Sequence, residues 1–204
     1  QLGLYPQVVQ GDEDLSILYY ILSKLEKYTS LAVFFEPQAF ADNYFTKLMS
    51  AVFSGDQRLS YLEISFERCR ITDKPFLVFC YQLLSKAMNL KSLKLLLGFS
   101  RVTDISLIAL GGWLEPIKMN LEAFMLGVEN TDISDDGLKE IFRTLEAVKT
   151  LELQLQRTKI TDQGLKDLGE KVLAQGKGLR EFILDVSETG ISDGGVKFVF
   201  GNLQ

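Results

Sequence analysis

Apolar residues recur along the chain in the phrase Leu-x-x-Leu-x-Leu-x-Leu, or a close variant of it. Apolar and other residues alternate through the second half of each copy, and a period of two predicts a strand with one buried and one exposed face. The chain is therefore predicted to form one short strand per copy. The six copies are Tyr28/Leu31/Val33/Phe35, Leu59/Leu62/Ile64/Phe66, Leu90/Leu93/Leu95/Leu97, Leu121/Phe124/Leu126/Val128, Val148/Leu151/Leu153/Leu155 and Leu179/Phe182/Leu184/Val186.

A triplet of an aliphatic residue, Ser or Thr, and Asp follows five of these strands, and apolar residues at helical spacing come after it. Successive triplets are 31 residues apart, except for an interval of 27 between Ile133 and Ile160. The loss of four residues, about one helical turn, predicts one shorter helix. The triplets are Ile71-Thr72-Asp73, Val102-Thr103-Asp104, Ile133-Ser134-Asp135, Ile160-Thr161-Asp162 and Ile191-Ser192-Asp193, with a weaker copy at Phe40-Ala41-Asp42.

Each repeat thus pairs a strand with a helix, and neither can bury its apolar face alone. Stacking the repeats predicts an α/β solenoid with a curved parallel β-sheet on the concave side and α-helices on the convex side. We expect a single domain over 1–204, with Leu2, Leu4 and Val9 aligned with Ile64, Phe66 and Ile71. Because no polar cap covers the apolar residues at either end of the predicted solenoid, we also expect the chain to be a segment of a longer protein. The predicted division is a partial repeat 1–27, repeats 28–58, 59–89, 90–120, 121–147 and 148–178, and a partial repeat 179–204.

These phrases resemble the leucine-rich-repeat family, in its ribonuclease-inhibitor-like class, and come closest to the Leu-x-Leu-x-Leu variant of protist proteins. The resemblance covers essentially the whole chain and implies a horseshoe-shaped scaffold for another protein. The sequence departs from that class where an Asn or Cys ladder usually follows the strand. The corresponding residues here are Gln38, Cys69, Ser100, Thr131, Thr158 and Thr189.

Composition removes most catalytic chemistry. The chain has no His and no Gly-rich phosphate loop, so we expect no enzyme activity, no catalytic residue, no metal site and no cofactor. A net charge of −5 disfavours nucleic acid as a partner. No apolar run approaches the ~18 residues of a membrane helix and no secretory segment opens the chain. With Cys69 and Cys80 expected to be unpaired, a reducing, cytoplasmic location follows.

Two polar columns have structural explanations. The repeated Asp, at Asp42, Asp73, Asp104, Asp135, Asp162 and Asp193, and the hydroxyl residue before it stand at helix starts, where they can cap free N–H groups. The small polar residues from Gln38 to Thr189 can satisfy backbone groups in the turn after each strand. Trp113 and the helical phenylalanines are expected in the core.

The exposed face of the strands is the remaining candidate site. Large apolar residues there, rimmed by carboxylates, are typical of surfaces that bind proteins. We therefore expect a partner with basic and apolar contact groups. The alternative is that flanking repeats or an adjacent loop of the same protein cover these residues. The candidate contact residues are Phe34, Tyr61, Glu63, Lys94, Leu96, Met125, Glu129, Glu152, Ile183 and Asp185.

Taken together, these features favour a non-enzymatic protein-interaction scaffold, as part of a larger protein or assembly. Two alternatives stay open. One is a substrate-receptor subunit of a ubiquitin-ligase-type complex. The other is a regulatory or targeting domain of an enzyme whose catalytic domain lies elsewhere.

Overall fold

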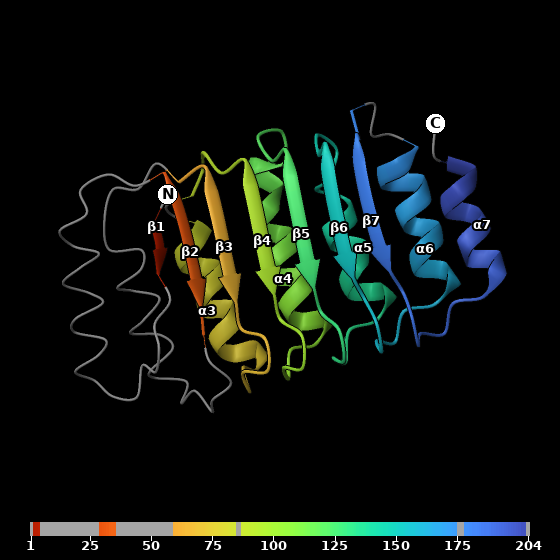
Figure 1. Ribbon diagram of the computed structural model, residues 1–204, viewed down its shortest axis with the longest axis horizontal. Coiled ribbons are helices and arrows are strands. Elements are labelled where there is room, and N and C mark those ends of the chain that lie inside the picture. The colour runs from red at the N-terminus through yellow and green to blue at the C-terminus, as the bar shows by residue number, and fades with distance from the viewer. Residues whose placement is uncertain (1, 5–28, 36–58, 85–86, 175–177, 203–204) are drawn as a thin grey trace.

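The computed structural model describes residues 2–4, 29–35, 59–84, 87–174 and 178–202. Seven parallel strands form one sheet in chain order, and from β3 onward a helix follows each strand (Figure 1). The strands are β1 (Leu2–Leu4), β2 (Ser30–Phe34), β3 (Tyr61–Ser65), β4 (Ser92–Leu96), β5 (Ala123–Gly127), β6 (Thr150–Gln154) and β7 (Glu181–Asp185). The helices are α3 (Asp73–Leu84), α4 (Asp104–Leu114), α5 (Asp135–Phe142), α6 (Asp162–Leu168) and α7 (Asp193–Asn202), with a 3-10 turn η1 (Glu115–Ile117) and a π-helical segment η2 (Gly169–Leu173).

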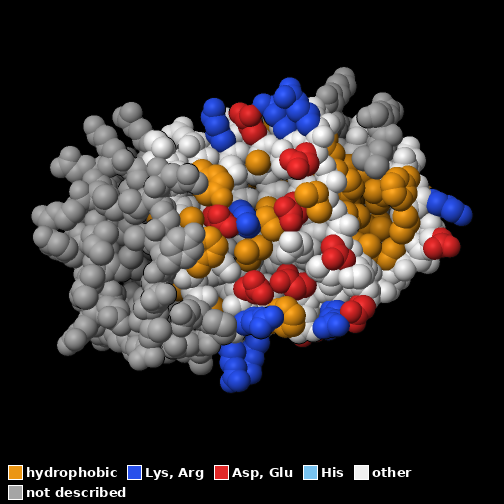
Figure 2. Space-filling view, viewed as in Figure 1, with side chains coloured by type: hydrophobic (Ala, Val, Ile, Leu, Met, Phe, Trp, Pro, Cys, Tyr) orange, Lys and Arg blue, Asp and Glu red, His pale blue; other side chains and the backbone are white. Residues whose placement is uncertain are grey.

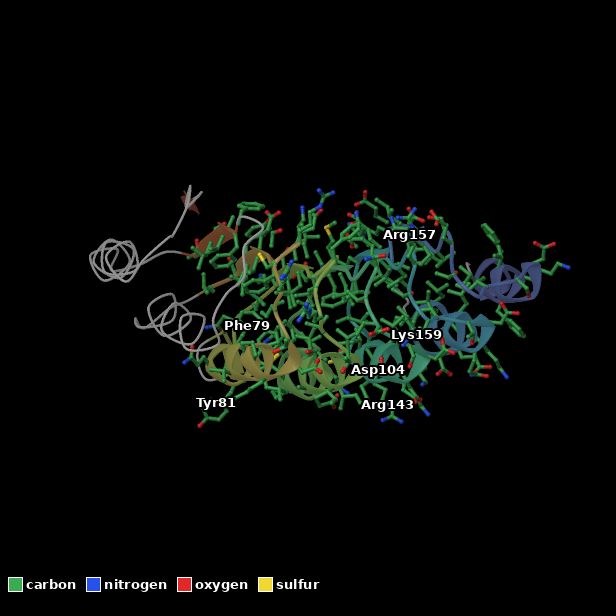
Figure 3. The ribbon with its side chains drawn as sticks, turned by 90° about the horizontal axis from the view of Figure 1, so that it is seen from below. Phe79, Tyr81, Asp104, Arg143, Arg157 and Lys159 are labelled. Atoms are coloured by element: carbon green, nitrogen blue, oxygen red, sulfur yellow. The ribbon has the colours of Figure 1, made fainter. Side chains whose placement is uncertain are left out.

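This arrangement is an α/β leucine-rich-repeat solenoid, as the repeat pattern predicts. The sheet forms one layer and helices α3–α7 the other, along the convex side of the curve (Figure 3). Phe79 lies between the layers, whereas Tyr81 and Arg143 point away from the sheet. The expected features at Tyr28, Gln38 and 40–42 lie outside the described residues.

The core lies between the two layers and is built from the predicted apolar positions. Leu62, Ile64 and Phe66 of the β3 repeat have no exposed surface, and the same positions of the β4, β5 and β6 repeats are buried. Trp113, the largest buried side chain, packs in the same core. Cys69 and Cys80 are buried and form no disulfide, as expected, and burial raises the pKa of the Cys80 thiol.

The predicted alignment of the first strand is wrong by two residues. Leu2 pairs with Leu31 and therefore occupies the position of Leu62, rather than that of Ile64. A shift of two residues leaves every side chain on the same face of the sheet, because strand side chains alternate with a period of two. The apolar pattern alone cannot distinguish these two registers.

Helix α5 is the short helix that the 27-residue interval predicts. It spans Asp135–Phe142, 8 residues, compared with 11 in α4 and 12 in α3. Helix α6 has only 7 residues, but it runs directly into the five residues of η2. The strands on either side, β5 and β6, keep full five-residue pairing. The missing turn therefore leaves the sheet unchanged.

The hydroxyl residues cap the helices, but the aspartates do not act as predicted. Thr103, Ser134 and Thr161 accept hydrogen bonds from backbone N–H groups in the first turns of α4, α5 and α6. The Asp after each of them is instead turned toward the next repeat. Asp135 Oδ1 accepts from the backbone N–H of Thr161 at 2.9 Å, and its Oδ2 accepts from the Thr161 hydroxyl at 2.5 Å.

We call this contact the Asp–hydroxyl ladder. It links Asp73 to Thr103, Asp104 to Ser134, Asp135 to Thr161 and Asp162 to Ser192, with two hydrogen bonds at each step. Because these bonds to charged oxygens are stronger than neutral ones, the ladder ties each helix start to the next. An Asp was expected to serve its own helix because capping is a local rule, whereas the ladder connects residues about one repeat apart.

Glycine in the first helical turn makes room for the ladder. A Cβ at Gly137 would lie 2.5 Å from Asp104 Oδ1, and one at Gly164 would overlap Asp135 Oδ1. Ser106 stands at the same position in α4, and its hydroxyl donates to Asp73 Oδ1 at 2.6 Å. In α4, α5 and α6 this position therefore holds either no side chain or one that hydrogen bonds to the Asp of the preceding repeat, whereas α3 has Pro75 there.

Gly164→Ala is expected to destabilise the protein by about 1–3 kcal/mol, because the added methyl group must displace Asp135. The measurement is urea unfolding followed by circular dichroism. Gly112→Ala is the matched control, since a Cβ there meets no atom within 4 Å. It should stabilise helix α4 by about 0.5–1 kcal/mol. Equal effects of the two substitutions would contradict the steric role of the ladder.

Asp135→Ala should lower the free energy of unfolding by about 1–3 kcal/mol, because the N–H and hydroxyl of Thr161 lose a charged acceptor. Asp136→Ala is the control, because Asp136 is an exposed acid in the same helical turn with no ladder contact. Its removal weakens only the interaction with the helix dipole, by about 0.3–1 kcal/mol. A loss at Asp136 as large as that at Asp135 would rule out the ladder as the cause.

Candidate functional site

The outward side chains of the strands form columns across the sheet, in the register expected from the sequence. Strand pairing joins Ala32, Glu63, Lys94, Met125, Glu152 and Ile183 into a central column. One flanking column runs from Ser30 through Tyr61 to Glu181, and the other from Phe34 through Leu96 to Asp185. These columns, with the residue two positions after each strand, are called the concave face below.

The large apolar residues of the concave face are less exposed than we expected. Phe34, Leu96 and Met125 are half-buried, and only Ile183, at 47% exposed, is among the strongly exposed apolar side chains. Strands in a sheet lie about 4.8 Å apart, so outward side chains in one column pack against each other and shield one another. The face is thus semi-apolar, with its apolar groups embedded between polar ones.

Tyr61, Glu63 and Lys94 form a hydrogen-bonded cluster across β3 and β4. The Tyr61 hydroxyl donates to Glu63 Oε2 at 2.7 Å, and Lys94 Nζ lies 2.9 Å from Glu63 Oε1. Burial, followed by the hydrogen bond and negative charge of Glu63, raises the pKa of Tyr61 to about 12. Both Glu63 oxygens are therefore occupied, and the phenol stays protonated over the physiological range.

A second set of polar contacts lies on β6 and β7. The Gln154 amide donates to Glu152 Oε1 at 2.9 Å, and the Gln156 amide donates to Asp185 Oδ2 at 2.6 Å. The backbone N–H of Ser187 also donates to Asp185, at 3.0 Å. Bonds from the Ser187 backbone and side chain, and then from Gln156, lower the pKa of Asp185. These hydrogen bonds hold both carboxylates in position.

Glu129 sits where a neighbouring side chain is missing. Its carboxylate occupies the space that a Cβ of Gly98 would take, and its Oε2 lies 3.1 Å from the Cβ position of Gly127. This oxygen is buried and has no hydrogen-bond partner. Burial, and to a smaller extent the charge of Glu67, raises the pKa of Glu129. Its own backbone N–H and the charge of Arg68 oppose this rise but do not cancel it. Among the described residues, no donor reaches the buried Oε2 of Glu129.

A row of left-handed residues edges the concave face. Arg68, Phe99, Asn130, Arg157 and Glu188 have φ between 54° and 60°. The backbone N–H of each of the first four donates to the following repeat, as from Phe99 to the Glu129 carbonyl at 2.8 Å. Their side chains contact along the row, with the Arg68 guanidinium 5.2 Å from the Phe99 ring and Arg157 paired with Glu188 at 2.8 Å. Nothing in the sequence marked these residues, since none is glycine.

Carboxylates and apolar groups are interspersed over the sheet in Figure 2, with few basic groups among them. The described acids of this face are Glu63, Glu67, Glu129, Glu152, Glu181 and Asp185, against the single base Lys94. The row at its edge adds Arg68, Arg157 and Glu188. Because Lys94 is already paired with Glu63, the net field of the face is negative. The structure thus brings together on one face all ten predicted contact residues, from Phe34 to Asp185.

Within the described residues, no group of three or more His, Cys, Asp or Glu side chains is placed to hold a metal ion. No helix in the described ranges has the length and apolar content needed to cross a membrane. The hydroxyls of the turn column act as predicted: Thr131, Thr158 and Thr189 each donate to a backbone carbonyl three residues earlier, at 2.6 to 2.7 Å.

Glu129→Gln is expected to raise the urea midpoint at neutral pH, because it removes an unneutralised charge from a partly buried niche. The sign follows from the raised pKa. The folded protein holds the Glu129 proton more tightly than the unfolded chain does, so the native protein is weakened above this pKa and recovers as the pH falls through it. The advantage of the amide should shrink below that pH. Glu181→Gln, at an exposed acid of the same face two strands away, is the control. A midpoint difference between Glu129→Gln and the unchanged chain that stays constant with pH would contradict the assignment.

No protein-family model matches the sequence, and no match is found among curated proteins. Among solved structures, the chain is similar to an internalin from Listeria monocytogenes, with 15% sequence identity and a TM-score of 0.44. The similarity covers 91% of this chain and 49% of that one, so the chain spans about half the length of that internalin.

Proposed function

We propose that this protein is a non-enzymatic interaction scaffold that binds another protein on its concave face. The observation that carries the proposal is the combination of ordered carboxylates and embedded apolar groups on one continuous sheet. Tyr61, Glu63 and Lys94 are linked by hydrogen bonds, so they lose little conformational freedom when a partner binds. Pre-ordered polar groups beside half-buried apolar ones favour a specific contact.

The partner we propose carries basic and apolar groups. Glu129 supports the basic component, because a Lys or Arg of the partner would supply the charge that this buried oxygen lacks. Leu96 and Met125, on the strands beside it, offer apolar area, and Ile183 offers more toward β7. An acidic face also speeds the approach of a basic partner, in a manner that added salt suppresses.

We further propose a ribonuclease-inhibitor-like repeat class, cytoplasmic location, and no role for a cofactor, nucleic acid or membrane. Full α-helices such as α3 and α4, within repeats of about 31 residues, support the class. The two buried cysteines, which form no disulfide, support a reducing compartment. The negative concave face supports the exclusion of nucleic acid, whose phosphates it would repel.

Substitution of the concave face is expected to abolish partner binding. The bait is the chain with Phe34, Leu96 and Met125 each changed to Asp, compared with the unchanged chain in capture from native lysate followed by mass spectrometry. Each captured candidate is then purified and titrated directly. The expected loss is at least about tenfold in Kd, as for contacts at the centre of an interface.

The matched control changes exposed apolar residues of the convex side, Ile105 and Ile108 of α4, to Asp. It adds the same type of charge away from the concave face and should retain the partner. Circular dichroism establishes that each variant is folded. If the concave variant binds the purified partner as tightly as the unchanged chain, the proposed site is wrong.

A further inference from the structure

Three exposed arginines lie together beyond the ends of β3 and β4. Arg68 and Arg70 belong to the loop after β3, and Arg101 belongs to the loop after β4. Two backbone hydrogen bonds join these loops. The Arg68 N–H donates to the Gly98 carbonyl at 2.8 Å, and the Arg101 N–H donates to the Ile71 carbonyl at 2.9 Å. Basic side chains gather at this end of the strands, beside the concave face, in Figure 2. We call the three residues the arginine cluster.

Bases also stand in the loop after β6, but acids of neighbouring repeats neutralise them. Arg157, at the position of Arg68, donates to both carboxylate oxygens of Glu188, at 2.9 and 2.8 Å. Lys159 Nζ lies 2.6 Å from Asp132 Oδ1. Each base of that loop therefore has an acid in an adjacent repeat.

Arg70 and Arg101 have no such acid. Neither guanidinium forms an ion pair or a hydrogen bond with any described residue. Asp132 stands at the position of Arg101 in the next repeat, but its carboxylate is bound to Lys159. The β3 and β4 repeats thus carry basic groups that the described part of the chain leaves unneutralised.

Arg68 is positioned by an aromatic ring. Its guanidinium carbon lies 5.2 Å from the centroid of the Phe99 ring, and a contact of this kind uses none of the N–H donors of the guanidinium. Its ion-pair partner is Glu67, with 3.6 Å between Arg68 Nε and Glu67 Oε1 and both side chains exposed. An exposed pair at this distance contributes little. Arg68 therefore adds its charge to those of Arg70 and Arg101.

The aspartates at the starts of α3 and α4 do not neutralise the cluster. Asp73 accepts hydrogen bonds from the N–H and hydroxyl of Thr103 and from the Ser106 hydroxyl. Asp104 accepts from the N–H and hydroxyl of Ser134. Both carboxylates are engaged in the Asp–hydroxyl ladder, and neither is paired with a base. The arginine cluster thus keeps an excess of positive charge.

The chemistry of three guanidinium groups selects the ligand. A guanidinium presents its N–H donors in a planar fork that fits two oxygens of a phosphoryl group. A phosphorylated side chain offers three acceptor oxygens and a charge of about −1.5 to −2, whereas a carboxylate offers two oxygens and a single charge. Clusters of arginines are accordingly a recurring means of recognising phosphorylated segments. The phosphoryl group therefore matches the excess charge of the cluster better than a carboxylate does.

The position of the cluster favours a phosphoryl group carried by a polypeptide. Arg68 directly follows Glu67, an outward residue of the concave face, so a polypeptide bound on that face passes the cluster. The carboxylates of the face repel a polyanion, whereas basic groups beside the phosphoryl group offset them. A phosphorylated residue close to basic and apolar ones therefore fits both surfaces.

We propose that the arginine cluster binds a phosphorylated side chain of the partner polypeptide. Arg70 and Arg101 donate to the phosphoryl oxygens, and Arg68, held on the Phe99 ring, supplies the third positive group. Phosphorylation of the partner therefore strengthens its binding to this chain. The inference rests on the proposed function in taking the partner to be a protein. The site itself is tested with a peptide that has no basic or large apolar group.

The probe is a short peptide of glycine and alanine with one central phosphoserine. It is titrated into the isotope-labelled 204-residue chain at about 50 mM salt, where screening is moderate, and followed by NMR spectroscopy. We expect saturable shifts in the signals of residues 68–70 and 99–101, with a Kd of roughly 0.1–1 mM. The same peptide with unmodified serine should bind at least about tenfold more weakly, because it lacks the charge. Equal affinities of the two peptides would overturn the proposal.

The chain with Arg70→Gln and Arg101→Gln is expected to bind the phosphoserine peptide about tenfold more weakly or worse, because charge-assisted donors are lost. The matched control carries Arg143→Gln and Arg157→Gln, which remove the same charge from bases paired with acids. It should stay within about twofold of the unchanged chain, since distant exposed charges are screened. Circular dichroism establishes that both variants are folded. An equal loss in the two variants would reduce the effect to net charge and overturn the site.

Three further probes identify the source of the phosphoryl group. Inorganic phosphate should bind no more tightly than the phosphoserine peptide, and much tighter binding would assign the cluster to a free anion. A peptide with glutamate in place of phosphoserine should bind more weakly, and equal binding would assign the cluster to acidic segments in general. Vesicles that contain phosphatidic acid should not retain the chain. Retention that is lost with Arg70→Gln and Arg101→Gln would assign the cluster to a membrane surface. Each of these three contrary results overturns the proposal.

The captured partner separates this inference from the proposed function. Phosphatase treatment of the partner should lower its affinity for the unchanged chain but not for the chain with Arg70→Gln and Arg101→Gln, as coupled groups require. If phosphatase has no effect while the concave substitutions abolish binding, the proposed function stands and this inference is wrong. If the peptide binds as expected while the concave substitutions leave the affinity of the partner unchanged, the arginine cluster stands and the concave site is wrong.

Discussion

The contact between neighbouring repeats is the interaction on which this structure depends. A single strand and helix cannot enclose their own leucines, so each repeat is stable only when another lies against it. Two kinds of contact hold neighbours together. Inward residues such as Leu93 and Leu126 fill the core between the layers, and the Asp–hydroxyl ladder fixes the helix starts at one edge of it. Apolar packing in the core has no preferred direction. The hydrogen bonds of the ladder, by contrast, require a fixed distance between the starts of neighbouring helices.

The difference between apolar burial and the directional hydrogen bonds of the ladder explains how much of the fold could be predicted. The apolar period identified the strands, their buried faces and the shortened α5, because burial acts on residue type and spacing. It misplaced β1 by two residues, since a shift of that size conserves the buried face. The ladder was also missed: Asp135 obeys the local rule for a helix start, yet its bonds go to Thr161 in the next repeat.

The concave face was predicted as a set of residues but not as a set of interactions. Its columns follow from the register, so all the expected side chains lie on it. Their conformations depend on cross-strand neighbours that no single repeat contains. Glu129 leans into its niche because residue 98, one repeat earlier, is glycine. Glu63 is neutralised because residue 94, one repeat later, is Lys. Such contacts between repeats can be predicted only when the strands have been aligned and the side-chain conformations are known.

The same logic describes the surface that we propose for binding. On the concave face most polar groups already satisfy one another, so a partner gains from shape, apolar contact and the few carboxylates left unpaired, such as Glu129. Specificity there depends on individual side chains.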